Sequence, residues 1–154
     1  MSAIEARLTS LGITIPHRSA APAGTYVPAV VSGNLVFTAG QLPFVDGELP
    51  AVGKVGADVT PDVARTNART SAINALAAVA EVLGSLDRVT RIVKVVGFVA
   101  SEPGFTAQPN VVDGASEVLA QTFGDAGVHA RSAVGVAVLP LDSPVEVELI
   151  VEFA

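Results

Sequence analysis

The segment from Ala130 to Glu152 restricts the possible folds more than any other part of the chain. It reads ARSAVGVAVLPLDSPVEVELIVE, two runs of alternating apolar and polar or small residues on either side of LPLDSP. Alternation with a period of two is typical of half-buried strands, and the residues between the runs favour a turn. We therefore predict two strands joined by a proline-bounded connection. Arg131 opens the first strand, and Glu146 and Glu148 share one face of the second.

Composition limits the class of protein. A chain of 154 residues is expected to form one domain, 1–154, with a core of its own. Half of the residues are apolar and only 16% are charged, so we expect copies of the chain to cover part of its surface. The net charge of −6, with nine scattered Lys and Arg residues, argues against a nucleic-acid partner.

Cysteine usage and hydropathy exclude further classes. The chain has no cysteine, which rules out a disulfide framework, thiolate catalysis and a cysteine-based metal site. No apolar run is long enough to cross a membrane, and the beginning of the sequence carries charges where a signal peptide needs its apolar stretch. We therefore expect a cytoplasmic protein.

Two long helices and one short helix are predicted from their start and stop signals. The first long helix begins with the capping pair Thr60-Pro61 and ends at Gly84, and its inner face opens with alanines that permit close approach to a sheet. The second runs from about Pro109 to Phe123. A short amphipathic helix is predicted from Ser2 to Leu11, at the beginning of the sequence.

The other strands complete the predicted sheet. A hairpin is expected from Tyr26–Val31 and Leu35–Ala39, joined by the three residues Ser32-Gly33-Asn34. Val89–Ala100 is the longest β-branched run and predicts a central strand, in which Gly97 marks a bulge or a close approach. This order of elements predicts an α+β domain, a mixed β-sheet with the two main helices packed on one face and an extra N-terminal helix.

Three motifs, in order along the chain, carry a resemblance to a known family. They are YVPAVVSGNLVFTAGQLP (26–43), VKVVGFVASEPGF (93–105) and ARSAVGVAVLPLDSPVEVE (130–148), in which a proline and a glutamate follow Arg131 by nine and fifteen residues. Together they resemble the Rid family, the reactive-intermediate deaminases, also called the YjgF family. The resemblance covers roughly Pro22 to Glu152, with features of a longer subgroup.

The resemblance implies a fold, an assembly and an activity. The fold is that of the bacterial chorismate mutase type, in a homotrimer whose sheets form a central barrel with a ligand cleft at each subunit interface. The activity is that of 2-iminobutanoate/2-iminopropanoate deaminases, the hydrolysis of small 2-imino or enamine acids to 2-oxo acids and ammonia. We expect the protein to need no cofactor and no metal.

The chemistry of this reaction assigns roles to residues in the motifs. A guanidinium binds a carboxylate through two parallel hydrogen bonds, so Arg131 is the expected substrate clamp. Hydrolysis also needs a water directed at the imine carbon by a positioned base, and by its motif Glu146 is the expected residue. Main-chain groups of Gly40 and Gln41 can approach a ligand because glycine has no side chain. The remaining substrate-binding positions implied by the resemblance are Tyr26, Ala39 and Ala133.

Several residues near Arg131 depart from the family pattern. Many members have a cysteine where this chain has Ala133, and a bulkier residue is usual at Gly135. Residues two apart share one face of a strand, so these two small residues predict a roomier pocket beside Arg131. His129 and His17 have no serine or metal-binding partner in the sequence pattern and receive no role, although His129 is close enough to line the cleft.

The sequence leaves alternatives to the deaminase open. A non-catalytic or sensing protein would bind a small carboxylate in the same cleft, and an endoribonuclease ranks third because of the acidic balance. A lone arginine at the start of a strand can also be an ion-pair residue, and glutamates that alternate with valines can be a solvated strand face. A water between Glu146 and a bound carboxylate would favour the enzyme.

Overall fold

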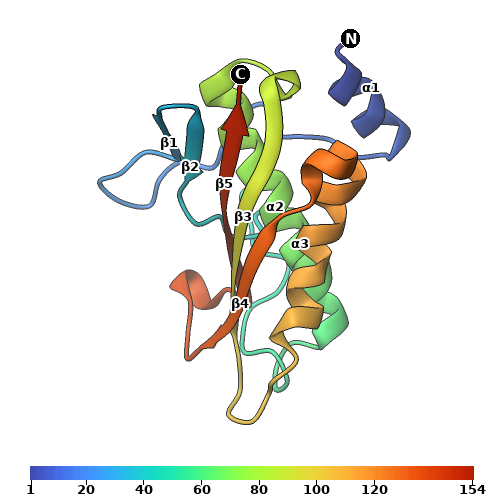
Figure 1. Cartoon of the computed structure of the whole chain (residues 1–154). Helices are drawn as coiled ribbons and strands as arrows, with labels where there is room; N and C mark the ends of the chain where they lie inside the picture. The colour runs from blue at the N-terminus through green and yellow to red at the C-terminus, as the bar shows by residue number, and fades with distance from the viewer.

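The chain forms a mixed five-stranded β-sheet that two long helices cover on one face (Figure 1). The computed structural model describes all 154 residues. The strands are β1 (Ala29–Ser32), β2 (Leu35–Thr38), β3 (Val89–Ala100), β4 (Ala130–Val136) and β5 (Val145–Phe153), and the helices are α1 (Ala3–Ser10), α2 (Pro61–Leu83) and α3 (Gln108–Phe123). The order in the sheet is β1-β2-β5-β3-β4, and only β3 and β4 are parallel. The predicted α+β fold, with its extra N-terminal helix, is confirmed.

Helix α2 begins and ends where its sequence signals predict. The side chain of Thr60 accepts a hydrogen bond from the backbone N–H of Val63 at 3.3 Å, and Gly84 ends the helix with a φ of +80°. The alanines on its inner face, Ala64, Ala68, Ala72 and Ala75, are fully buried. Their small side chains allow the helix axis to lie close to the sheet, where it packs on β5. None of the helices combines the length and apolarity that a membrane crossing requires.

Strand β3 approaches helix α3 closely at Gly97. A Cβ atom on this residue would lie 2.5 Å from a methyl carbon of Val112 on α3, a distance that no side chain can tolerate. The irregularities of β3 lie elsewhere, between Val89 and Arg91 and between Ile92 and Lys94. Of the two explanations predicted for this glycine, the close approach is therefore the correct one.

The hairpin is shorter and tighter than its sequence predicts. Strand β1 begins at Ala29, so Tyr26 lies in the preceding loop, and β2 ends one residue before Ala39. Ser32 pairs with Leu35, which leaves a two-residue turn in place of the predicted three. Apolar residues that lead into a strand can stay outside the ladder, because pairing depends on the partner strand as well as on the pattern.

The two faces of the sheet have different surroundings. Val145 and Val147 on β5 point toward the helices and are buried, whereas Glu146 and Glu148 alternate with them and point to the other face. We call the side of the sheet that α2 and α3 leave uncovered the open face (Figure 1). The apolar side chains exposed there include Val30, Phe37 and Val134, which are 51%, 37% and 44% exposed.

Candidate functional site

Arg131 lies on edge strand β4 with its side chain on the helix-covered face. Its Cα partner on β3 is the fully buried Val95. The guanidinium meets helix α3, where Nη1 donates to Oδ1 of Asp113 at 2.7 Å and to the hydroxyl of Ser116 at 3.1 Å, and Nη2 donates to the carbonyl oxygen of Pro109 at 3.3 Å. Only 22% of the side chain is exposed. Arg131 is therefore held in one orientation by three groups of a single helix.

The serine that contacts Arg131 also contacts a histidine. Oγ of Ser116 lies 2.9 Å from Nε2 of His129, and Nδ1 of the same ring lies 2.6 Å from the carbonyl oxygen of Gly127. The prediction that His129 has no serine partner is wrong, because the partner comes from α3 and not from the local sequence. The spacing of Asp113 and Ser116, three residues apart, places these two side chains on one helix face but does not indicate the contact with His129.

Glu146 lies on β5, on the open face, packed against Gly40. A Cβ atom on Gly40 would lie 2.7 Å from both Cδ and Oε1 of Glu146, so any larger residue at this position would displace the carboxyl group. Burial raises the pKa of the Glu146 carboxyl above its ordinary value, and the charge of Glu148 raises it further. A carboxyl group that is costly to ionise and has no hydrogen-bonding partner in the chain readily takes up a proton once it is ionised.

Gly40 and Gln41 differ in what they can offer a ligand. The peptide N–H and C=O of Gly40 make no backbone hydrogen bond. The peptide groups of Gln41 exchange hydrogen bonds with Val147, at 2.8 and 3.1 Å, and its side chain donates to the carbonyl oxygen of Ala39 at 3.4 Å. The main chain of Gly40 is thus available beside Glu146, whereas that of Gln41 fixes this loop to β5. The main-chain role toward a ligand stays a prediction, and of the two residues only Gly40 has free peptide groups.

Tyr26 lies in the loop before β1, and β1 is the edge strand opposite to the one that carries Arg131. Strand β1 is the first strand in the sheet order, and Arg131 lies on the last strand, β4. The ring is half exposed, and its hydroxyl accepts a hydrogen bond from the N–H of Ala23 at 3.2 Å. Four strand spacings of ~4.8 Å separate β1 from β4, so Tyr26 and Arg131 of one chain do not share a small ligand.

Arg131 and Glu146 are also not brought together within one chain. Glu146 pairs through Phe98 of β3 with Val134 of β4, which lies three residues beyond Arg131. Two strand spacings and three residues along a strand correspond to roughly 14 Å between their Cα atoms. Their side chains also leave opposite faces of the sheet. A site that uses both groups on one small molecule has to combine two copies of the chain.

Ala133 and Gly135 do not create a roomier pocket. Both share the helix-covered face with Arg131, as predicted, through their pairing with Gly97 and Val99. Ala133 packs against the core. A Cβ atom on Gly135 would lie 2.7 Å from Nε2 of Gln108, the first residue of α3. The space beside these small residues is therefore filled by the core and by the side chain of Gln108.

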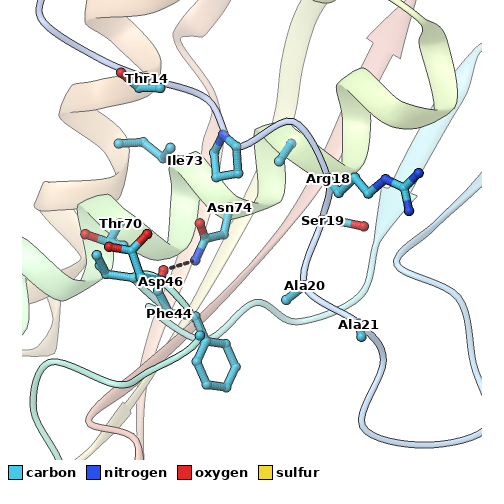
Figure 2. Close-up of a pocket in the computed structure, with 14 residues that line it drawn as sticks. Thr14, Arg18, Ser19, Ala20, Ala21, Phe44, Asp46, Thr70, Ile73 and Asn74 are labelled. Carbon is cyan, nitrogen blue, oxygen red and sulfur yellow. Dashed lines mark hydrogen bonds between the residues drawn. The ribbon is translucent and has the colours of Figure 1, made fainter.

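A cavity of about 720 Å³ lies away from all of the predicted site residues (Figure 2). Thr14, Arg18 and neighbouring residues of the N-terminal segment form one side, and Ile73 and Asn74 on α2 form the other. Nδ2 of Asn74 donates to the carbonyl oxygens of Leu42 and Phe44, at 3.0 and 3.1 Å. Asn74 thereby anchors the loop that follows Gly40 to α2.

Comparisons with known proteins agree with this architecture. A family model described as "YjgF/chorismate_mutase-like, putative endoribonuclease" matches residues 5–153. The protein TCP17 of Trypanosoma cruzi is 43% identical over 150 residues, which cover 97% of this chain and 93% of TCP17. The crystal structure of Atu1372 from Agrobacterium tumefaciens, a protein described as having unknown function, is 43% identical and has a TM-score of 0.91, covering 98% of this chain and 92% of that one.

A more distant relative has been seen with a ligand. The crystal structure of E. coli TdcF with bound serine is 30% identical, covers 90% of this chain and 96% of TdcF, and has a TM-score of 0.62. The difference between these TM-scores separates an Atu1372-like subgroup, which includes this chain, from the subgroup of TdcF. The predicted resemblance is confirmed by the matched family model and by relatives that share most of the chain. The chain belongs to the YjgF/Rid family and has its chorismate-mutase-like α+β fold.

Proposed function

We propose that this protein hydrolyses small 2-imino or enamine acids to 2-oxo acids and ammonia, in a cleft between two subunits. Arg131 of one subunit binds the substrate carboxylate, and Glu146 of the neighbouring subunit directs the attacking water. The observation that carries this proposal is the state of Glu146, a carboxyl group with a raised pKa and no hydrogen-bonding partner, beside the free peptide groups of Gly40. A raised pKa makes the ionised carboxylate a stronger base toward a water molecule.

The reaction needs only groups that the chain supplies. The water oxygen attacks the imine carbon, the electron pair of the C=N bond moves to nitrogen, and Glu146 takes a proton from the water. Glu146 returns this proton to the nitrogen. The C–N bond then breaks as the new carbonyl bond forms, and the remaining hydroxyl proton passes to the nitrogen, which leaves as ammonia. The peptide N–H of Gly40 is available to hydrogen-bond the substrate, which would orient the imine carbon toward this water.

Arg131 supports a substrate that carries a carboxylate. It is mostly enclosed and firmly held, which is the condition for recognising a planar anion through two parallel hydrogen bonds. The relative TdcF was crystallised with serine, a small molecule with such a carboxylate. We therefore propose substrates of similar size, derived from small amino acids.

A homotrimer would bring the two halves of this site together. Arg131 lies on an edge strand whose outer backbone groups are unpaired in the isolated chain, and the open face exposes Val30, Phe37 and Val134. Covering this apolar surface would favour association. Sedimentation at micromolar concentration should yield a species of three chains, and a dominant species of 15.5 kDa would rule this assembly out.

The activity itself is tested by ammonia release. Imines are generated in situ from several amino acids by an amino-acid oxidase, and ammonia is measured with and without the protein. The proposal predicts faster release with the wild type and the uncatalysed rate with Arg131→Ala. Equal rates in all samples, for every amino acid tried, would refute the deaminase.

One observation favours a second candidate, a protein that binds small carboxylates without catalysis. Arg131 already has a carboxylate partner in Asp113, so its orientation does not by itself require a reaction. This candidate predicts measurable binding of a 2-oxo acid with no acceleration of ammonia release. The endoribonuclease named in the family description is a third candidate, which the net charge of −6 disfavours, and a labelled RNA incubated with the same preparations tests it.

A further inference from the structure

We infer that Asp113 and Ser116 are positioning residues that hold Arg131 with one two-donor edge free for the substrate carboxylate. The inference rests on the proposed function and adds a role for helix α3, which contributes these residues from outside the family motifs quoted above. Both residues contact Nη1 of Arg131, at 2.7 and 3.1 Å. The role of each follows from the number and direction of the donors on a guanidinium group.

The donors of Arg131 divide into an occupied set and a free set. A guanidinium has five N–H bonds, two on Nη1, two on Nη2 and one on Nε. Asp113 and Ser116 account for the two on Nη1, and the carbonyl oxygen of Pro109 takes one on Nη2 at 3.3 Å. The N–H of Nε and the second N–H of Nη2 have no partner in the chain. Because Nε and Nη2 form one edge of the planar group, these donors suit a carboxylate.

The direction of the hydrogen bond at Ser116 is set by His129. Nδ1 of the ring lies 2.6 Å from the carbonyl oxygen of Gly127, and since a carbonyl only accepts, Nδ1 carries a hydrogen. In the neutral ring Nε2 is then the acceptor, and the hydroxyl of Ser116 donates to it at 2.9 Å. This leaves the lone pairs of the serine oxygen for the N–H of Arg131. The histidine thus keeps the serine in its accepting role toward the guanidinium.

Asp113 could affect ligand binding in two opposite ways. As a negative charge beside the guanidinium, it weakens the attraction for an anionic ligand, so its removal would tighten binding. As a positioning residue, it orders a long side chain before the ligand arrives, so its removal would weaken binding. Ordering such a side chain costs enough to change affinity by about two- to tenfold. Asp113 and Ser116 both bind Nη1, the nitrogen that is not part of the free edge, and we therefore expect the positioning effect to exceed the charge effect.

The test compares three variants with the wild-type assembly. Binding of pyruvate, a small 2-oxo acid, is measured by calorimetry, and KM and kcat are measured by ammonia release. Asp113→Ala should weaken pyruvate binding about two- to tenfold and raise KM by a similar factor, with kcat unchanged because Glu146 is intact. Asp113→Asn keeps an acceptor oxygen of the same shape and removes the negative charge, so it should bind pyruvate at least as tightly as the wild type. Ser116→Ala should show a smaller weakening of the same sign.

The matched control is Glu117→Gln. Glu117 is on the same helix and forms an ion pair with Arg65 on α2, away from Arg131, and its substitution should leave pyruvate affinity unchanged. Tighter or unchanged binding in both Asp113→Ala and Ser116→Ala would overturn the positioning role. A wild type that binds pyruvate no better than Arg131→Lys would refute the carboxylate clamp itself. A failure of the positioning role leaves the difference between wild type and Arg131→Lys intact, so the two failures are distinguishable.

Discussion

The two faces of the sheet treat their charged residues in opposite ways. On the helix-covered face, Arg131 has three hydrogen-bonding partners from α3 and keeps little of its side chain exposed. On the open face, Glu146 has no hydrogen-bonding partner, and burial together with Glu148 raises its pKa. The surroundings of Arg131 stabilise its positive charge, whereas the surroundings of Glu146 destabilise its negative charge.

This difference indicates that Arg131 is suited to stay fixed and that Glu146 is suited to change its protonation state. A cation with satisfied donors on one side is suited to hold a substrate in place. A carboxyl group that lacks partners can gain and lose a proton during a reaction. The contrast also explains why Gly40 contacts Glu146, because a larger residue would push the carboxyl group out of its position. The following variants alter one face and leave the other unchanged.

The largest expected effect is on turnover in Glu146→Gln. The glutamine keeps the shape of the side chain but cannot accept a proton from water, so kcat should fall by ~10²–10⁴-fold. Affinity for a 2-oxo acid should change little, because Arg131 is intact. Glu152→Gln is the control, since Glu152 is on the same face of β5 but bonds to Thr90 and Arg91. Equal turnover in Glu146→Gln and wild type would show that another group directs the water.

The second effect is on binding in Arg131→Lys. Lysine keeps the charge but loses the two-donor edge, so 2-oxo acid affinity should fall by roughly ten- to hundredfold. Arg65→Lys, which alters an ion-paired arginine on α2, is the matched control and should bind normally. Melting temperatures of both variants are measured on the same preparations. If Arg131→Lys binds the ligand normally while Arg131→Ala unfolds or dissociates, the arginine has a structural role only.

A third variant, Gly40→Ala, should affect stability and activity together. The added methyl group would displace the Glu146 carboxyl group. Because this group ends a flexible and partly exposed side chain, the cost should lie near the lower end of the ~1–3 kcal/mol found for overpacking in cores. Combining it with Glu146→Ala should remove most of this cost, because the clashing group is then absent. Denaturant unfolding of the four proteins of this cycle measures the coupling. Additive costs would mean that Gly40 and Glu146 do not interact in solution.

The smallest effect concerns pH. Glu148 carries a charge that raises the pKa of Glu146, although less than burial does. Glu148→Gln removes this charge, so the pKa of Glu146 should fall. The base would then stay deprotonated at lower pH, and the acid limb of the kcat–pH profile should move toward lower pH while the plateau is retained. A shift in the opposite direction would contradict the role of Glu146 as the base.

The fold could be predicted from the sequence because its signals are local. Helix α2 begins at the capping pair Thr60-Pro61 and ends at Gly84, as capping chemistry predicts. The period-two pattern after Ala130 marks two strands. The predicted first strand starts at Tyr26, whereas the observed strand starts at Ala29, because the strand pattern includes residues that have no partner on a neighbouring strand. Pairing depends on residues far away in the sequence, which a local pattern does not contain.

The site was predictable only in its separate residues. The family motifs select Arg131 and Glu146, but their placement on opposite faces follows from the register of β3 with β4 and β5. The contact between Ser116 and His129 likewise requires α3 to lie against the beginning of β4. Such juxtapositions arise from tertiary packing, and a sequence that suggests the partners does not reveal their geometry.

Subunit mixing tests whether Arg131 of one subunit and Glu146 of another form one site. Arg131→Ala and Glu146→Gln chains are each inactive on this account, and they are mixed in equal amounts under conditions that exchange subunits. Random assembly then gives about a quarter of the interfaces an intact pair of residues. Mixing should therefore restore about a quarter of wild-type ammonia release. Mixed assemblies, verified by mass, that remain as inactive as their parents would contradict it.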